Sequence, residues 1–188
     1  MATKKAMINS SINGGYDEMY TPEYAITPLL KHLNKFKGKT VWECTDYGSS
    51  NITKVLKENG FIVKSTHITN SNFDFLNDKP DFEFDLIITN PPYSTKTKFI
   101  EKCYEYEKPF AMLMPLTTLE GEDRGEMFGK NGIEVMVFDT RVDYMDKGST
   151  AWYNTSWFCH DILPKTLVFQ KLNKPKKERK KKDDTTIQ

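Results

Sequence analysis

Short apolar runs alternate along this chain with longer stretches in which apolar residues recur at helical spacing. Each run is bounded by glycine, proline or polar residues, a pattern that predicts a strand. The predicted strands are 40–44, 61–66, 84–89, 110–114 and 133–138. The predicted helices are 21–36, 51–59, 94–107 and 119–130. Because alternating strands and helices are joined by right-handed crossovers, the pattern predicts an α/β fold with a mostly parallel sheet and helices on both faces.

Local signals refine these elements at three places. Pro28 lies inside the first predicted helix, where we expect a kink or a restart because proline lacks the N–H of a helical hydrogen bond. Gly60 follows the second predicted helix and indicates its end. After residue 139 the alternation stops. An aromatic stretch at 152–158 and a strand at 166–170 then predict a closing antiparallel β-hairpin.

Charge divides the chain into a body and a tail. Its 188 residues are enough for one domain with a hydrophobic core, and the formal net charge is only +1. Residues 174–188 hold seven basic and three acidic side chains, whereas the rest holds twenty and twenty-three. We therefore expect 174–188 to be a disordered basic tail, which either adds salt-sensitive affinity for phosphates or only improves solubility. We expect 1–15 to be flexible and 16–173 to be the folded domain.

Several protein classes are not indicated by the sequence. It has no run of 18 apolar residues and no charged-then-apolar leader, so we expect neither membrane insertion nor secretion. Cys44, Cys103 and Cys159 are odd in number and far apart, which predicts neither a disulfide framework nor a zinc site and is typical of the reducing cytoplasm. The three histidines are scattered as well, so no metal site is predicted.

The most informative motif is Asn90-Pro91-Pro92-Tyr93, directly after the predicted strand 84–89. Taken alone, four such residues are equally consistent with an ordinary turn. At the carboxyl end of a buried strand, however, they lie where open α/β sheets bind ligands, and the proline pair makes the loop stiff. The loop presents the Asn90 side-chain oxygen and the Asn90-Pro91 carbonyls to a planar NH2 group, with the Tyr93 ring beside it. This pattern predicts a site for alkylating an exocyclic amine.

In its order of elements, the segment 16–170 resembles a small S-adenosylmethionine-dependent DNA N6-adenine methyltransferase of the compact kind that phages often carry. The motif at 90–93 is similar to the D/N/S-P-P-Y/F/W catalytic motif of that family. The resemblance implies a Rossmann-like methyltransferase fold, S-adenosylmethionine as cofactor, DNA as partner and the host cytoplasm as location. It also implies Asn90, Pro91, Pro92 and Tyr93 as catalytic residues.

Other segments carry the resemblance to the cofactor site. Thr21-Pro22-Glu23 resembles the Thr-Pro segment that family members use near the methionine end of the cofactor. Phe73-Asp74-Phe75-Leu76 resembles the loop beside the cofactor adenine, with Asp74 as acceptor for its amino group and Phe75 as ring contact. The implied cofactor-binding residues are Tyr20, Thr21, Pro22, Glu43, Thr45, Gly48, His67, Asp74, Phe75 and Asn90.

Two positions depart from the family pattern. Tyr47 and Ser49 stand where small glycines are expected after Glu43, and only Gly48 remains. If the φ of such a residue is positive, the backbone strain is on the order of 1–2 kcal/mol. His67 either stands where an acidic residue usually accepts both ribose hydroxyls or is simply a loop residue. Since a neutral histidine offers at most one acceptor nitrogen, losing a charge-assisted pair costs roughly 1.5–3 kcal/mol of cofactor binding.

Several functions stay open at this point. The same motif serves release-factor glutamine methyltransferases and RNA methyltransferases, and the residues at 90–93 do not distinguish RNA from DNA. The departures leave three alternatives: a working methyltransferase with an unusual cofactor pocket, an enzyme of weakened activity, or a fold kept for binding nucleic acid or protein. Trp152, Tyr153 and Trp157, with Arg141 and Lys147 nearby, either stack on bases or form the core of the closing hairpin.

Overall fold

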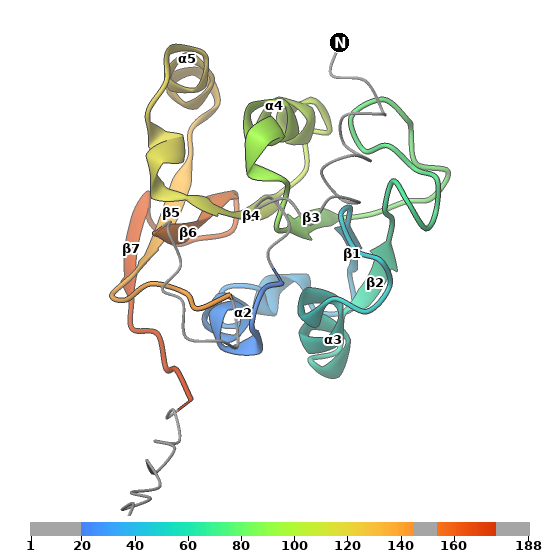
Figure 1. Ribbon diagram of the computed structural model, residues 1–188, viewed down its shortest axis with the longest axis horizontal. Coiled ribbons are helices and arrows are strands. Elements are labelled where there is room, and N and C mark those ends of the chain that lie inside the picture. Colours follow the sequence, from blue (N-terminus) through green and yellow to red (C-terminus); the bar gives the residue numbers. More distant parts are fainter. Residues whose placement is uncertain (1–19, 145–153, 176–188) are drawn as a thin grey trace, which may run out of the picture.

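The computed structural model describes residues 20–144 and 154–175. Within these ranges a single sheet of seven strands lies between two layers of helices (Figure 1). Helices α2 (Glu23–Leu30) and α3 (Asn51–Glu58) cover one face, while α4 (Lys96–Glu105) and α5 (Glu122–Asn131) cover the other. Short 3-10 helices join the elements: η1 (Asn34–Phe36), η2 (Tyr93–Thr95) and η3 (Leu116–Leu119). The α/β architecture expected from the sequence is confirmed.

The sheet is parallel except at one strand. Its members are β1 (Thr40–Glu43), β2 (Ile62–Ser65), β3 (Leu86–Thr89), β4 (Phe110–Pro115), β5 (Glu134–Phe138), β6 (Thr155–His160) and β7 (Leu167–Gln170), in the order β2-β1-β3-β4-β6-β5-β7. Only β6 is reversed, because it pairs antiparallel with both β4 and β5. The adjacent strands β1 and β3 are parallel, so their carboxyl ends open at the same edge of the sheet.

The strands β1 to β5 and the helices α3 to α5 overlap the elements predicted from the sequence. The first helix differs, because it ends at Leu30 rather than at residue 36. Pro28 cannot donate a helical hydrogen bond near the end of α2. The backbone then tightens: the N–H of His32 donates to the Leu29 carbonyl at 2.9 Å, and that of Leu33 to the Leu30 carbonyl at 3.0 Å. These shorter-range bonds separate α2 from η1.

The C-terminal strands pair differently from the expected hairpin. The antiparallel direction is confirmed for β6, but β6 enters the sheet between β4 and β5, and β7 pairs in parallel with β5 at the edge. Trp157 and Phe158 on β6 are fully buried, as an inner strand covered on both faces requires. On β7, Leu167 is 49% and Phe169 is 77% exposed, which an edge strand tolerates. The strand whose large apolar side chains are buried on both faces therefore takes the inner position in the sheet.

Trp157 belongs to the hydrophobic core. Its indole N–H donates to the Ala25 carbonyl on α2 at 2.8 Å, and its side chain is fully buried. A buried ring with a satisfied N–H cannot stack on a nucleobase, so for Trp157 the core alternative is confirmed. The other aromatic candidates at 152–153, together with Lys147, lie outside the described residues.

An aromatic cluster anchors the loop that follows β2. The Trp42 ring on β1 contacts Phe75 edge-on with centroids 5.0 Å apart and lies 4.9 Å from Phe84. Its indole N–H donates to the hydroxyl of Thr66 at 2.9 Å. Aromatic contacts of this kind contribute about 0.5–1.5 kcal/mol each beyond buried area. The loop at 73–76 is thereby held over the carboxyl end of β1.

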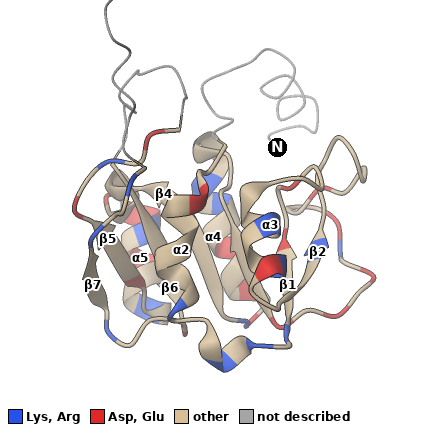
Figure 2. Ribbon diagram, turned by 90° about the horizontal axis from the view of Figure 1, so that it is seen from below, with Lys and Arg blue, Asp and Glu red and all other residues tan. Residues whose placement is uncertain are grey.

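Charged residues are distributed over several elements of the described molecule. Lys, Arg, Asp and Glu are interspersed in the view of Figure 2. Lys174, the first residue of the predicted basic tail, forms an ion pair with Asp143 at 3.2 Å. The segment 1–15 and residues 176–188 lie outside the described residues, so their disorder stays a prediction. None of the helices in the described ranges is long and apolar enough to cross a membrane.

Candidate cofactor and amine-binding site

A cavity of about 220 Å³ lies at the carboxyl ends of β1 and β3. Its lining brings together most of the site residues predicted from the sequence, drawn from separate segments of the chain. These are Tyr20, Thr21, Glu43, Thr45, His67, Asp74, Phe75, Asn90 and Pro92. Four predicted residues are not part of the lining: Pro22, Gly48, Pro91 and Tyr93.

One part of the lining is aromatic. The Phe75 ring stacks on the Phe99 ring of α4 with centroids 4.9 Å apart and an interplanar angle of 17°. Asp74, beside Phe75, is buried, and its carboxylate accepts from the Leu76 N–H at 3.0 Å and from the Asn77 side chain at 2.7 Å. A carboxylate has about four lone-pair positions, so these two bonds shape the turn without using its full capacity as an acceptor.

Glu43 ends β1 as a buried acid. Its Oε1 accepts from the Thr45 N–H and hydroxyl, each at 3.1 Å, and from the Thr89 hydroxyl at 2.6 Å. Burial raises the pKa of Glu43 to about 7, against the opposing effect of these hydrogen bonds and with a further increase from the nearby Asp46 charge. The site therefore holds a carboxyl group that changes its charge near neutral pH.

The turn between β1 and α3 is organised by Asp46, and we call residues 43–50 the carboxylate loop. One oxygen of Asp46 accepts from three consecutive backbone N–H groups: Gly48 at 2.8 Å, Ser49 at 3.0 Å and Ser50 at 2.8 Å. Of the residues in this loop, only Gly48 has a positive φ, at 100°. The strain considered for Tyr47 and Ser49 is therefore absent, because neither residue adopts the left-handed conformation.

Tyr47 covers the residue that replaces the expected ribose acceptor. Its ring stacks on His67 with centroids 3.7 Å apart and an interplanar angle of 29°. The Nδ1 atom of His67 accepts from the Thr69 N–H at 3.1 Å. This bond assigns the proton of a neutral imidazole to Nε2. The Nδ1 atom of His67 is therefore bonded to the backbone of Thr69, unlike the free ribose acceptor expected at that position.

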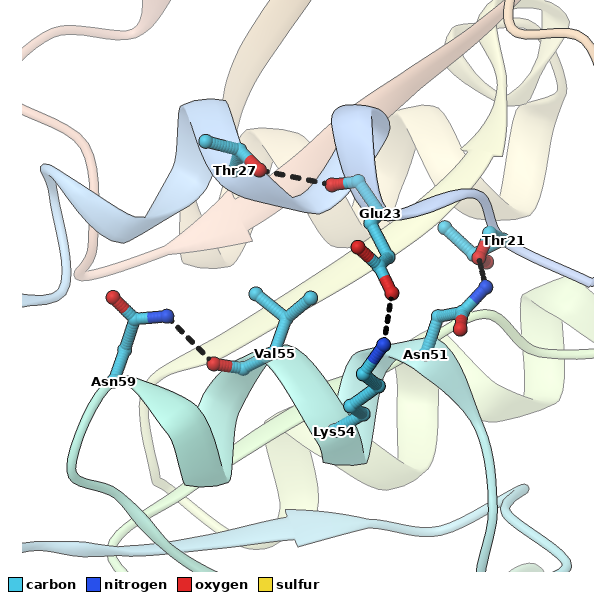
Figure 3. Close-up of polar contacts among 7 residues, drawn as sticks. All are labelled: Thr21, Glu23, Thr27, Asn51, Lys54, Val55 and Asn59. Carbon is cyan, nitrogen blue, oxygen red and sulfur yellow. Dashed lines mark hydrogen bonds and ion pairs between the residues drawn. The ribbon is translucent and has the colours of Figure 1, made fainter.

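The loop at 90–93, which we call the proline loop, faces the carboxylate loop across the strand ends. The Asn90 side-chain NH2 donates to the Thr21 hydroxyl at 3.1 Å, and the Asn90 carbonyl accepts from the Thr45 hydroxyl at 3.3 Å. Thr21 is fixed in turn, because its carbonyl accepts from the Asn51 side chain at 2.9 Å (Figure 3). Because the NH2 group of the Asn90 side chain points at Thr21, this bond fixes the orientation of the amide and the position of its oxygen.

Lys54 and Glu23 strengthen the same junction. Their side chains form an ion pair at 2.6 Å between α3 and α2 (Figure 3). The pair is exposed, so water screens it and its contribution to stability is small. The segment that carries Thr21 therefore depends mainly on the Asn51 bond and on the burial of α2.

Tyr93 lies apart from the cavity lining. Its side chain is only 7% exposed, and its hydroxyl lies 3.4 Å from the hydroxyl of Tyr144. The Tyr144 hydroxyl donates to that of Thr155 on β6 at 2.8 Å. Burial raises the pKa of Tyr144 to about 12, which keeps this phenol neutral as a donor. Stacking of Tyr93 on a substrate base therefore stays a prediction.

Sequence reasoning missed several residues of the lining. Asp46, Ser50, Asn51 and Phe99 all line the cavity. A signal for the first three is present, because Asp-x-Gly-Ser-Ser-Asn before an apolar helix contains residues typical of helix N-caps and turns. For Phe99 the sequence predicts only an apolar position in a helix, with no signal for a place in the cavity lining. Among the described residues, no cluster of His, Cys, Asp and Glu is arranged to hold a metal ion.

Comparisons with known proteins give a fold but no sequence family. No family model matches the chain, and no curated protein matches it in sequence. A Listeria monocytogenes protein assigned to the class I S-adenosylmethionine-dependent methyltransferases superimposes over 90% of this chain and 72% of its own, with a TM-score of 0.58 and 14% identity.

Two further structures are more distant. A protein assigned as the modification subunit of a type I restriction enzyme from Vibrio vulnificus gives a TM-score of 0.48 at 12% identity, over 94% of this chain and 52% of its own. A TehB-like S-adenosylmethionine-dependent methyltransferase from Corynebacterium glutamicum gives 0.42 at 15% identity, over 82% and 93%. The likeness to the Listeria protein shows that the chain has a class I methyltransferase fold.

Proposed function

We propose that this protein transfers a methyl group from S-adenosylmethionine to the exocyclic N6 of adenine in DNA. One observation carries the proposal: a single cavity brings the residues of the predicted cofactor site beside Asn90 of the proline loop. The class I methyltransferase fold supports the same assignment. The choice of adenine in DNA depends on the resemblance of the motif at 90–93 to the family of N6-adenine enzymes.

The residues present are compatible with the cofactor. The stacked rings of Phe75 and Phe99 offer an aromatic wall to an adenine ring, and Asp74 offers acceptor positions to its amino group. Glu43 places a buried carboxyl group where a cationic ligand would favour its ionised form. When bound, the cofactor supplies an electrophilic methyl group on a sulfonium. His67 is the least favourable member of the site, because its Nδ1 already accepts from Thr69.

The chemical contribution of the chain is alignment. The lone pair of adenine N6 is delocalised into the ring, so this nitrogen is a poor nucleophile. Hydrogen bonds from N6–H to the Asn90 side-chain oxygen and to the backbone carbonyl of Pro91 favour a more tetrahedral nitrogen. The second bond requires the Pro91 carbonyl to face the ligand, although Pro91 is not part of the cavity lining. Because nitrogen becomes acidic as its bond to carbon forms, the proton can leave to solvent and no strong base is required. Alignment of this kind lowers a barrier by several kcal/mol.

The target adenine has to leave the duplex stack, which costs a few kcal/mol. We expect Tyr93 to offset part of that cost by stacking, which requires its ring to move from its buried position near Tyr144. Single-stranded DNA and RNA avoid the cost of unpairing, so both should be tested as substrates.

A second function is favoured by one observation, the stacking of Tyr47 on His67 in the wall of the cavity. This pair stands where the family pattern places the charged ribose acceptor, and neither side chain carries a carboxylate. Weak cofactor binding would result, and the chain would then act as a module that binds nucleic acid or protein.

Calorimetric titration with S-adenosylmethionine separates the two functions. The enzyme predicts micromolar binding, followed by transfer of labelled methyl groups to DNA that lacks N6-methyladenine. Parallel reactions with single-stranded DNA and RNA identify the substrate, and Asn90→Ala is the control that should bind cofactor with strongly reduced turnover. Millimolar or absent cofactor binding would favour the binding module.

A further inference from the structure

Asp46 has no part in the proposed chemistry, yet it is the most highly bonded side chain of the site. It is 2% exposed. While one carboxylate oxygen accepts from the N–H groups of residues 48–50, the other accepts from the Ser65 hydroxyl at 2.8 Å and from the Thr53 hydroxyl. The carboxylate thus connects the loop after β1 to α3 and to the end of β2.

The three N–H groups belong to the turn that starts α3. Ser50 is the N-cap of that helix, and its hydroxyl accepts from the Thr53 N–H at 3.1 Å. Successive N–H groups before a helix form the concave anion site that binds phosphate in many α/β proteins. In this chain the anion at that position is the carboxylate of Asp46. The hydrogen bonds lower the pKa of Asp46 although burial opposes them, so the group is ionised at neutral pH.

The same carboxylate contributes to the charge of the cavity. Asp46, Glu43 and Asp74 all belong to the lining, and the described lining residues include no Lys or Arg. A phosphate entering the cavity would meet carboxylates instead of backbone N–H groups or basic side chains. The same carboxylates attract a ligand with a net positive charge.

We propose that Asp46 is a positioning residue that replaces the missing glycines: its carboxylate holds residues 46–50 in the ligand-receiving shape and fills the anion site, so that the cavity accepts a cationic nucleoside and excludes phosphorylated nucleotides. The assignment of a nucleoside ligand depends on the function proposed above. The positioning of the loop does not depend on it, and the two parts are tested separately.

The first test measures the loop without any nucleoside. Amide hydrogen exchange of residues 48–50 should be slow in the wild type and faster in Asp46→Ala by about tenfold or more, since each N–H loses a charge-assisted acceptor. Asp46→Asn keeps an oxygen for the three N–H groups and should retain most of the protection. Formate at high concentration should restore protection in Asp46→Ala alone, because it can occupy the vacated anion site.

A matched control removes a carboxylate from α3 without touching the loop. Glu58 is an exposed residue at the end of that helix, so Glu58→Ala should exchange like the wild type with and without formate. If Asp46→Ala retains wild-type protection, or if formate protects Glu58→Ala as much as Asp46→Ala, the positioning role is wrong. If Asp46→Ala does not fold, slow exchange in Asp46→Asn supports the role and wild-type-like exchange of an Asp46→Ser variant contradicts it.

The second test measures which ligands enter. Calorimetric titrations compare S-adenosylmethionine with ADP for the wild type and the Asp46 variants. The wild type should bind S-adenosylmethionine at least about tenfold more tightly than ADP, and the ratio should fall about tenfold in Asp46→Ala, whose N–H groups can accept a phosphate. Equal wild-type affinities would overturn the exclusion of phosphates. If the wild type binds neither ligand, the proposed function fails, while the exchange data still decide the role of Asp46.

Discussion

The proline loop and the carboxylate loop follow adjacent strands, yet they are made rigid in different ways. Residues 90–93 are stiff because two prolines fix φ within the covalent chain. Residues 43–50 contain no proline, and their shape depends on hydrogen bonds to the carboxyl groups of Glu43 and Asp46. The first loop should therefore tolerate changes of pH and of neighbouring residues, whereas the second should be sensitive to both.

This difference also decides which chemistry each loop can perform. The proline loop presents neutral acceptors that need no particular protonation state. The carboxylate loop presents two acids whose pKa values move in opposite directions, upward for Glu43 because of burial and downward for Asp46 because of its hydrogen bonds. The proline loop thus aligns the amine, while the carboxylate loop of the same site recognises the charge of the ligand.

The largest effect is expected in the proline loop. Asn90→Ala removes the side-chain acceptor for the amine and should lower turnover about 100- to 1,000-fold, the range seen when one preorganised hydrogen-bonding group is removed from a reacting centre. Cofactor affinity, measured by calorimetry, should change far less. Equal losses of turnover and affinity would contradict the assigned role of Asn90.

The next effect concerns pH and the carboxylate loop. The pKa of Glu43 is raised to about 7, so the folded state binds this proton more tightly than the unfolded chain does. The stability contributed by protonated Glu43 is complete below its unfolded pKa and is lost as pH rises to about 7. The expected loss is about 3 kcal/mol. Urea denaturation between about pH 4 and 8 measures it.

Glu43→Gln provides the control for this prediction. Glutamine keeps an oxygen that can accept from Thr45 and Thr89 but cannot ionise. Its unfolding free energy should be less dependent on pH than that of the wild type over the same range. A wild-type slope that is unchanged in Glu43→Gln would show that another group titrates.

A smaller effect tests how the two regions cooperate. Thr21 accepts from the Asn90 side chain, so Thr21→Val removes the bond that orients the amide while keeping the shape of the side chain. Turnover should fall about tenfold, the equivalent of roughly one hydrogen bond, and Thr21→Ser should restore it. If Thr21→Val mainly weakens cofactor binding, Thr21 contacts the cofactor instead of positioning Asn90.

The smallest effect is expected at Tyr144. Tyr144→Phe loses the bond to Thr155 and should cost about 1 kcal/mol of unfolding free energy, which thermal denaturation resolves as a fall of a few degrees in Tm. Tyr24→Phe is a comparable control, because it removes another tyrosine hydroxyl, one that accepts from the Asp143 N–H at 2.8 Å. A Tyr144→Phe protein as stable as the wild type would show that the bond contributes nothing.

The sequence was sufficient wherever a local signal determines the structure. The strand before the proline loop and the end of α3 near Gly60 were predictable from local pattern. The grouping of Asp74 and Phe75 with Asn90 was implied by the resemblance to a family. The insertion of β6 between β4 and β5 was not predictable, because pairing of distant strands depends on which strand can be buried on both faces.

The role of Asp46 illustrates a second limit. Its five acceptor contacts come from residues 48–50, from α3 and from β2, and a sequence pattern shows only the first of these groups. Comparison with the family pattern drew attention to Tyr47 and Ser49, whose backbone proved unstrained. The compensating residue lay immediately before them.

The proposed function is tested most directly by titrating the wild-type protein with S-adenosylmethionine and then adding unmethylated DNA to the same sample. We expect saturable micromolar binding and then the appearance of N6-methyladenine in the DNA, detected by mass spectrometry of the nucleosides. Absence of binding at millimolar cofactor would show that the protein is not a methyltransferase.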